Sequence, residues 1–483
     1  MITLLLLIPL IGCLAILPIQ EGFENNNSRM KQIALITSVI NFLISIVMWV
    51  EFDSSTSQYQ FVQDFQSLSF CQLHVGIDGI SLYFVLLTTF ITPICILSNW
   101  QDINKRLKYF LISFLILETL QIAVFVVLDL LLFYVFFESV LIPLFLIVGI
   151  WGASEARIRA SFLLFLYTLF GSLFMLLAIM VIYYNMGTTD FELIALQEIS
   201  LESQKLLWLA FFISFAIKTP LWPFHGWLFR AHAEAPLAGS IVLAAIILKL
   251  ATYGYLRILL PIFPDATSYF SPLIQTIAVI TLIYSSLATL RQVDLKALVA
   301  YSSISHMAVV ILGIFSNTIQ GIEGAILLSI AHGFVSPALF ICVGGILYNR
   351  YHTRILLYYR GMALFMPVFT VLFFLFILFN MGVPLSLNWV GEFLSLSGIF
   401  QRNPVMAVLG ASGIVLSAAY SIWFYNRISY GQFSQYLQPT KDISRREFML
   451  LLPLLLATVA FGILPNIILD TVHFSVSTLL YNV

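Results

Sequence analysis

The sequence predicts an all-α integral membrane protein with about fourteen transmembrane helices. Of its 483 residues, 61% are hydrophobic and only 9% are charged, which is more apolar surface than a water-soluble fold can bury. The apolar residues form continuous blocks of about 20, the length of a helix that crosses the hydrocarbon core. They do not alternate as the residues of a barrel strand do, so helices are expected throughout.

The apolar blocks can be followed along the whole chain. In order they lie near residues 2–19, 31–50, 77–98, 108–128, 129–150, 160–184, 206–228, 236–258, 272–290, 295–316, 321–348, 366–399, 404–426 and 448–469. Each is long enough to cross a bilayer at about 1.5 Å of rise per residue, so fourteen spans are expected.

The positions of the basic residues support this count. Short loops rich in lysine and arginine stay on the side of the membrane where the chain is made. Of the 22 basic residues, 17 lie in or beside the odd-numbered loops. Lys205, Arg257 and Arg402 belong to even-numbered loops, and Lys218 and Lys249 lie inside spans. A wrong helix count would scramble this alternation, so both termini are expected on the face opposite the basic loops.

Several charged residues fall inside the predicted spans. They are Glu118, Glu138, Lys218, Lys249 and Glu392. A charge at the bilayer centre costs roughly 2.5 to 3.5 kcal/mol, so such side chains face the protein interior and a partner or water. Glu118, together with Asp129, either lines an entrance or serves only to cap and pair near a helix end.

Two of the predicted spans contain helix-breaking residues. Pro220 and Pro223 interrupt the seventh span, and Gly382 and Pro384 interrupt the twelfth. Spans 4–8 and 9–13 form two sets of five in which the fourth member is broken. Because five is odd, the second set starts in the opposite orientation, which predicts an inverted repeat with the transport site at the breaks. The predicted divisions are 1–106 (helices 1–3), 107–258 (first repeat), 272–430 (second repeat) and 447–483 (helix 14).

Buried lysine and glutamate suit proton transfer. Burial and a nearby opposite charge shift their proton affinities in opposite directions, so moving a partner acts as a switch. Histidine, with a reference pKa near 6.5, can relay protons between them. The histidines of the central region are His225, His232, His306 and His332. The alternative interpretations are a purely structural ion pair between Glu138 and Lys218, and histidines that only pack.

No cofactor, metal ion or nucleic acid is expected to bind this chain. Its four cysteines, Cys13, Cys71, Cys95 and Cys342, are scattered, without a CxxC pair or a neighbouring histidine. The sequence contains no glycine-rich phosphate loop, no GxGxxG after a strand and no nucleophile elbow. The separations between the histidines give no repeated spacing for a haem held by two of them.

Five segments together resemble the subunit 4 family of the mitochondrial NADH dehydrogenase, respiratory complex I. They are VGIDGISLYF (75–84), LLLFYVFFESVLIPLFLIVGIWG (130–152), FAIKTPLWPFHGWLFRAHAEAPLAGSIVLAAIILKLATYGYLR (215–257), LRQVDLKALVAYSSISHM (290–307) and WVGEFL (389–394). The resemblance runs over nearly the whole chain. It implies an antiporter-like, proton-translocating subunit of the membrane arm, beside paralogous subunits and lipid. NADH, FMN, iron–sulfur clusters and ubiquinone would be bound by other subunits.

The resemblance also implies which residues form the proton-transfer axis. The axis residues would be Glu138, Lys218, Lys249 and Glu392, with His225, His232, His306 and His332 as a possible relay. A proton would enter from the basic-loop face, charge Lys249, pass towards Glu392 and leave on the opposite face. The chain departs from the family at Phe229, where a proline is usual, and at Arg230.

The low charge and the high Phe, Leu and Ile content favour the mitochondrial inner membrane, with both termini in the intermembrane space. A bacterial inner membrane is the alternative location. The rival functions are a subunit of a multisubunit sodium (cation)/proton antiporter and a scaffold that only holds the membrane arm together.

Overall fold

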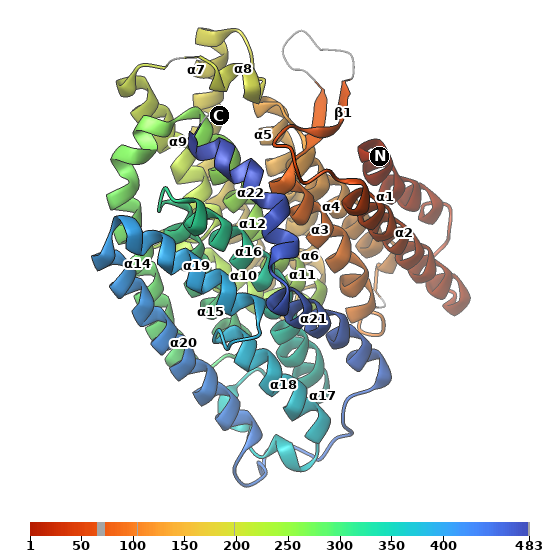
Figure 1. Ribbon diagram of the computed structural model, residues 1–483. Coiled ribbons are helices and arrows are strands. Elements are labelled where there is room, and N and C mark those ends of the chain that lie inside the picture. The colour runs from red at the N-terminus through yellow and green to blue at the C-terminus, as the bar shows by residue number, and fades with distance from the viewer. Residues whose placement is uncertain (65–72, 104, 198, 482–483) are drawn as a thin grey trace.

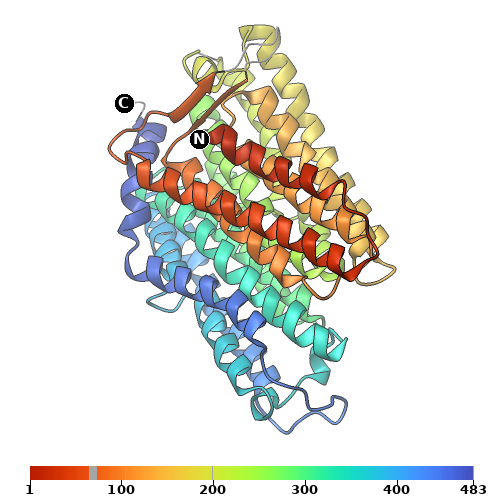
Figure 2. The ribbon, with the colours of Figure 1, turned by 90° about the vertical axis from the view of Figure 1, so that its right-hand side faces the viewer.

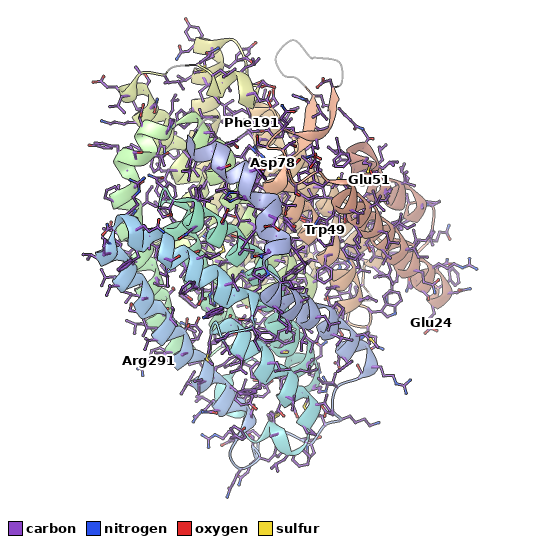
Figure 3. The ribbon with its side chains drawn as sticks, in the orientation of Figure 1. Glu24, Trp49, Glu51, Asp78, Phe191 and Arg291 are labelled. Atoms are coloured by element: carbon purple, nitrogen blue, oxygen red, sulfur yellow. The ribbon has the colours of Figure 1, made fainter. Side chains whose placement is uncertain are left out.

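The computed structural model describes residues 1–64, 73–103, 105–197 and 199–481, which fold into an elongated helical bundle (Figure 1). Cys71 lies outside the described residues. Seen from the side, many long helices run next to one another, with α1 (Ile2–Ile16) and α2 (Glu24–Glu51) on the outside (Figure 2). Glu24 and Arg291 lie at the edges of the bundle (Figure 3).

Eleven helical segments in the described part of the chain are long and apolar enough to cross a membrane. They are α2, α3 (Gly79–Ser98), α4 (Leu107–Val126), α5 (Leu130–Ser139) with α6 (Leu141–Trp151), α7 (Arg157–Met186), Leu237–Ile262, α14 (Pro264–Leu290), α15 (Leu295–Ile314), Ile319–Tyr351, α20 (Pro404–Ser429) and α21 (Arg445–Ile463). Shorter apolar helices are α1, α18 (Pro367–Asn380) and α22 (Asn466–Tyr481). The prediction of a helical membrane protein is confirmed, whereas the count of fourteen crossings stays a prediction.

Three of these segments form the centre of the bundle. In Leu237–Ile262, α15 and Ile319–Tyr351 the most apolar stretch is 100% buried, against 28% in α2 and 22% in α21. Polar side chains on the three central segments therefore face protein and not lipid. They are the place where a charged residue can be tolerated inside the membrane.

Two of the central segments contain π-helical turns. Leu237–Ile262 consists of α11 (Leu237–Val242), η2 (Leu243–Ile247), α12 (Leu248–Gly254), η3 (Tyr255–Leu259) and α13 (Leu260–Ile262), of which η2 and η3 are π-helical. Ile319–Tyr351 consists of α16 (Ile319–Phe340), the π-helical η4 (Ile341–Leu347) and α17 (Tyr348–Tyr351). Such turns are rare and concentrate at functional sites.

The helix is interrupted at both places where the sequence predicts a break. At the first, α9 (Leu201–Lys218) is followed by a 3₁₀ turn, η1 (Phe224–Trp227), and by α10 (Leu228–Glu234). The carbonyl of Ile217, at the end of α9, accepts a hydrogen bond of 2.8 Å from the Trp227 indole. The carbonyl is thus satisfied by a side chain instead of the next helical turn.

At the second break, α18 ends at Asn380 and α19 (Leu387–Arg402) begins seven residues later. Gly382 and Leu385 both have a left-handed backbone, with φ +73° and +77°. This region favours glycine, so Leu385 is strained. Close packing of α19 on α16 depends on glycine as well, since a Cβ on Gly391 would lie 2.6 Å from the Leu328 backbone nitrogen.

The structure contains features that the sequence did not predict. An antiparallel pair of short strands, β1 (Gln60–Asp64) and β2 (His74–Ile77), joins α2 to α3. The predicted single C-terminal helix is divided into α21 and α22, because Pro465 between them lacks a backbone donor. The remaining short elements are α8 (Phe191–Ala195), η5 (Leu356–Tyr358) and η6 (Met362–Leu364).

Candidate proton-transfer site

Lys249, His332, His306 and Glu392 form one continuous row of polar side chains at the centre of the bundle. Lys249 Nζ lies 2.6 Å from His332 Nδ1. The rings of His332 and His306 have centroids 5.8 Å apart. His306 Nδ1 lies 3.1 Å from Glu392 Oε1. These four residues, the central chain, come from α12, α16, α15 and α19 and are all buried.

Lys249 is held by groups that carry no formal charge. Its side chain is 0% exposed. It stands two residues after the end of the π-helical turn η2, and its Nζ donates a 2.5 Å hydrogen bond to the carbonyl of Ala244 within that turn. Among the described residues, no carboxylate lies within ion-pair distance of its Nζ. A lysine beside a carboxylate would keep its proton, whereas this one can pass a proton to His332.

Glu392 sits against the second helix break. A Cβ added to Gly382 would lie 2.5 Å from Glu392 Oε2, so a larger residue here would push the carboxylate from its present position. His306, its neighbour in the central chain, is oriented from its other side by Asn380 Oδ1, 3.2 Å from Nε2. Glu392 also lines a cavity of about 670 Å³ between α19 and α20.

Lys218 lies at the first helix break, away from direct contact with Glu138. Its Nζ donates a 2.8 Å hydrogen bond to the Phe137 carbonyl and lies 3.3 Å from the centre of the Phe137 ring. Glu138 Oε1 is buried without a hydrogen-bond partner. The described residues therefore do not show the close structural ion pair that was the alternative interpretation.

The other two predicted histidines lie outside the central chain. His232 is 0% exposed, stacks face to face on Phe340 at 4.6 Å, and has no hydrogen-bond partner on either ring nitrogen. His225 is only partly buried, and its ring lies 5.4 Å from that of Tyr284. The structure thus brings His332 next to Lys249 and His306 next to Glu392. His225 and His232 contact neither of these two charged residues within hydrogen-bond distance in the described part of the chain.

Asp129 and Glu118 have structural partners. Asp129 caps α5 by accepting hydrogen bonds from the backbone nitrogens of Leu131 and Leu132. Glu118 accepts a 2.7 Å hydrogen bond from the Asn41 side chain. These contacts support capping and pairing as the roles of the two carboxylates.

Two residues of the site were missed by the sequence interpretation. Asn380 stands next to the predicted break, where an amide beside Gly382 could have marked it as a partner of the charged residues. Lys296 was counted with the basic residues beside a loop, at the edge of the span 295–316, yet it is the second residue of α15 and is 2% exposed.

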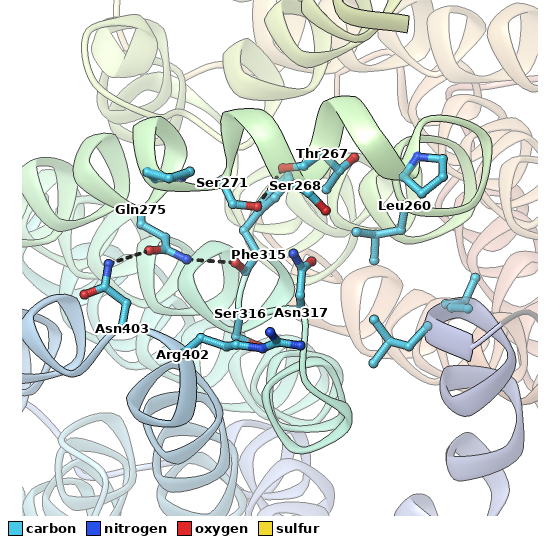
Figure 4. A pocket seen from close by; sticks show the side chains of 14 residues that line it. Leu260, Thr267, Ser268, Ser271, Gln275, Phe315, Ser316, Asn317, Arg402 and Asn403 are labelled. Carbon is cyan, nitrogen blue, oxygen red and sulfur yellow. Dashed lines mark hydrogen bonds between the residues drawn. The ribbon is translucent and has the colours of Figure 1, made fainter. Parts of the chain in front are cut away.

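A polar pocket of about 500 Å³ lies at the ends of α14, α15, α19 and α20 (Figure 4). Gln275 donates to the Phe315 carbonyl at 2.9 Å and accepts from Asn403 at 3.1 Å. Arg402 is the one charged residue among those that line the pocket. α15 and α19 also carry His306 and Glu392, so the pocket lies at the even-loop ends of two helices of the central chain.

Within the described ranges, no three His, Cys, Asp or Glu side chains are grouped so that they could hold a metal ion. The cysteines of this part of the chain, Cys13, Cys95 and Cys342, are buried and unpaired.

The fold and the buried charged chain define an antiporter-like membrane subunit. Residues 127–417 match the family model described as NADH:quinone oxidoreductase/Mrp antiporter, transmembrane. The chain is similar to the NADH-ubiquinone oxidoreductase chain 4 of Mycosarcoma maydis, at 73% identity over 100% of both chains. It is also 50% identical to that of Arabidopsis thaliana, over 98% of this chain and 96% of the relative.

The chain belongs to the NADH-ubiquinone oxidoreductase chain 4 family, and it is a proton-translocating membrane-arm subunit of complex I. A solved structure of respiratory complex I from Thermus thermophilus with bound NADH contains a similar chain, with a TM-score of 0.88, 28% identity, and coverage of 99% of this chain and 100% of the other. As in that complex, the chain sits with other membrane subunits.

The fold is shared with an antiporter complex. The Mrp complex from Dietzia sp. contains a chain with a TM-score of 0.85, 18% identity, and coverage of 99% of this chain and 97% of the other. At this identity the likeness concerns the fold alone. The antiporter alternative is therefore the weaker one.

Proposed function

We propose that the central chain is the path along which this subunit moves protons, and that Glu138 and Lys218 control it. A proton held by Lys249 passes through His332 and His306 to Glu392. The observation that supports this path is the closeness of its members in the buried interior: hydrogen-bond distances join Lys249 to His332 and His306 to Glu392, and the two histidine rings have centroids 5.8 Å apart. Lysine, imidazole and carboxylate can each both take up and release a proton.

The control acts through the distance between Lys218 and Glu138. Lys218 is bonded to a carbonyl, and Glu138 Oε1 has no partner. If Lys218 moved to within about 4 Å of Glu138, the attraction would change by up to about 4 kcal/mol at the effective dielectric of protein sites. A change of that size is enough to alter which neighbouring group holds a proton. The broken helix at Lys218 provides the freedom for this movement.

The location of the chain and its orientation complete the proposal. We infer a place in the mitochondrial inner membrane with both termini in the intermembrane space, because the basic loops then face the matrix. Residues 107–258 and 272–430 would be the two inverted repeats. The neighbours would be paralogous antiporter-like subunits, and other subunits would bind NADH, FMN, iron–sulfur clusters and ubiquinone.

The test replaces two members of the central chain in the assembled complex. Lys249→Met and Glu392→Gln keep approximate size but cannot cycle a proton, so pumping per NADH oxidised should fall or turnover should drop at least about tenfold. Lys31→Met is the matched control, because Lys31 also donates to a backbone carbonyl, that of Trp100 at 2.6 Å.

The readouts are NADH oxidation and acidification in sealed vesicles, normalised to the amount of complex on native gels. If both central variants pumped as well as the Lys31→Met control, the chain would be a scaffold and the proposed path would be wrong.

A further inference from the structure

We propose that Lys296 is a proton-transfer residue that links a pocket on the basic-loop face to Lys249, by way of His232. The proposal rests on the proposed path through the central chain and gives that path its uptake branch.

Lys296 is buried without a carboxylate that would fix its charge. It is 2% exposed, and its Nζ donates a 2.9 Å hydrogen bond to the Ala235 carbonyl. In the part of the chain that the structure describes, no Asp or Glu oxygen lies within 4.0 Å of this nitrogen. Burial of an unpaired ammonium costs several kcal/mol. The neutral amine avoids this cost, so Lys296 can occupy both protonation states.

One face of a single helix connects Lys296 with the central chain. His332, Phe340 and Gly344 lie at multiples of four residues along α16 and η4, with about 6 Å of rise between the last two. His332 contacts Lys249. Gly344 contacts Lys296, because a Cβ built on this glycine would lie 2.7 Å from Lys296 Cε. Both lysines therefore lie along one row.

His232 fills the interval in this row. Its ring stacks on Phe340 at 4.6 Å with only 6° between the planes, which leaves its edges free. Both ring nitrogens are buried and have no partner. A histidine that serves only for packing normally has at least one bonded nitrogen. Its stacking partner Phe340 lies between His332, which contacts Lys249, and Gly344, which contacts Lys296, so His232 stands between the contacts of the two lysines.

A pocket on the basic-loop face lies beside the outer end of this row. It has a volume of about 410 Å³ and is lined by Asp294 and Ala297, which flank Lys296 in the sequence, and by Glu234, Arg159 and Arg230. Arg354 joins its two carboxylates, at 3.1 Å from Glu234 and 3.4 Å from Asp294.

One of these carboxylates is kept in its charged form. Burial favours the neutral form of Glu234, but hydrogen bonds from Ser154 and the charge of Arg354 outweigh it and hold the pKa below its ordinary value. Glu234 thus stays ionised at the edge of the pocket.

The transfer moves one proton and changes no other bond. Neutral Lys296 takes a proton from water in the pocket and becomes an ammonium. It passes that proton to neutral His232, which becomes an imidazolium and then protonates neutral Lys249. Both relay residues return to the neutral form, and the pocket water is left as hydroxide until it is neutralised from the bulk.

The experiment compares substitutions of Lys296 in the whole complex. Lys296→Arg keeps the positive charge and the donor to Ala235 but holds its proton at all relevant pH values, so a relay predicts at least about tenfold slower pumping. Lys296→His is smaller and titrates, so it should restore part of the pumping. That restored rate should fall as the pH on the basic-loop side rises through about 6.5.

The controls separate this inference from the proposed path. Lys31→Met should pump at the wild-type rate and Lys249→Met should not. If Lys249→Met fails while Lys296→Arg and Lys296→His both pump normally without the added pH dependence, the uptake branch is wrong and the central chain stands. If Lys249→Met pumps normally, the path and its branch are both wrong. Pumping is normalised to assembled complex on native gels in every case.

Discussion

Gly382→Ala tests the link between the second helix break and Glu392, the proton acceptor of the proposed path. The substitution adds one methyl group to a residue with φ +73°. Its Cβ would lie 2.5 Å from Glu392 Oε2, so the carboxylate has to retreat by about 1 Å to reach ordinary contact at 3.4 Å. We expect a rotation of that size to disturb the contact of Oε1 with His306 Nδ1, which is now 3.1 Å.

The backbone effect and the effect on the site differ in size. Alanine in the left-handed region costs roughly 1 to 2 kcal/mol, which lowers the amount of assembled complex modestly. Displacing a transfer partner by about 1 Å can cost about a hundredfold in rate. We therefore expect turnover per assembled complex to fall by about ten- to a hundredfold.

Gly187→Ala is the matched control, since Gly187 has φ +72° and nothing within 4 Å of an added Cβ. It carries the same backbone strain without the clash. The assay is NADH-driven proton uptake into vesicles with native gels for assembly. Equal turnover of the two alanine variants would refute the argument that Gly382 positions Glu392.

Three further outcomes are expected. Trp227→Phe leaves a buried carbonyl at the end of α9 without its donor and should lower stability by about 1 to 3 kcal/mol, seen as an earlier thermal dissociation of the complex. Arg257→Met leaves the buried Asp78 carboxylate, now 2.7 Å from the guanidinium, unpaired. This should cost about 3 to 5 kcal/mol and sharply reduce assembly, and wild-type levels would contradict it. Cysteines introduced at the exposed Ser57 and Tyr436 should react with an impermeant maleimide from opposite faces of the membrane. If both cysteines reacted from the same face, the predicted topology would be wrong.

Both helix breaks and most of the charged site could be predicted because they depend on local chemistry. Proline and glycine interrupt a helix wherever it packs, so the breaks near Pro220 and Gly382 are visible in the sequence. A charged residue inside an apolar block must face the interior, which singled out Lys249 and Glu392. The same argument did not distinguish Lys296, because it stands at the edge of its block.

Partnership between side chains could not be predicted, since it depends on how the helices rotate about their axes. Lys249 and His332 are 83 residues apart in the sequence, and only the packing of their helices brings them within 2.6 Å. His225 and His232 looked equivalent in the sequence. The fold buries His232 completely against Phe340 and leaves His225 partly exposed.

The sequence by itself determined that this chain is a helical membrane protein, where its helices break and which charged residues lie within them. Hydrophobicity and helix-breaking are properties of short segments and do not require knowledge of neighbours. Only the tertiary structure decided which charged side chains lie next to one another. It placed Lys218 on a carbonyl instead of on Glu138, brought two histidines between Lys249 and Glu392, and buried Lys296 beside a polar pocket. Hydrogen bonds act over about 3 Å, and that distance is fixed by packing between helices.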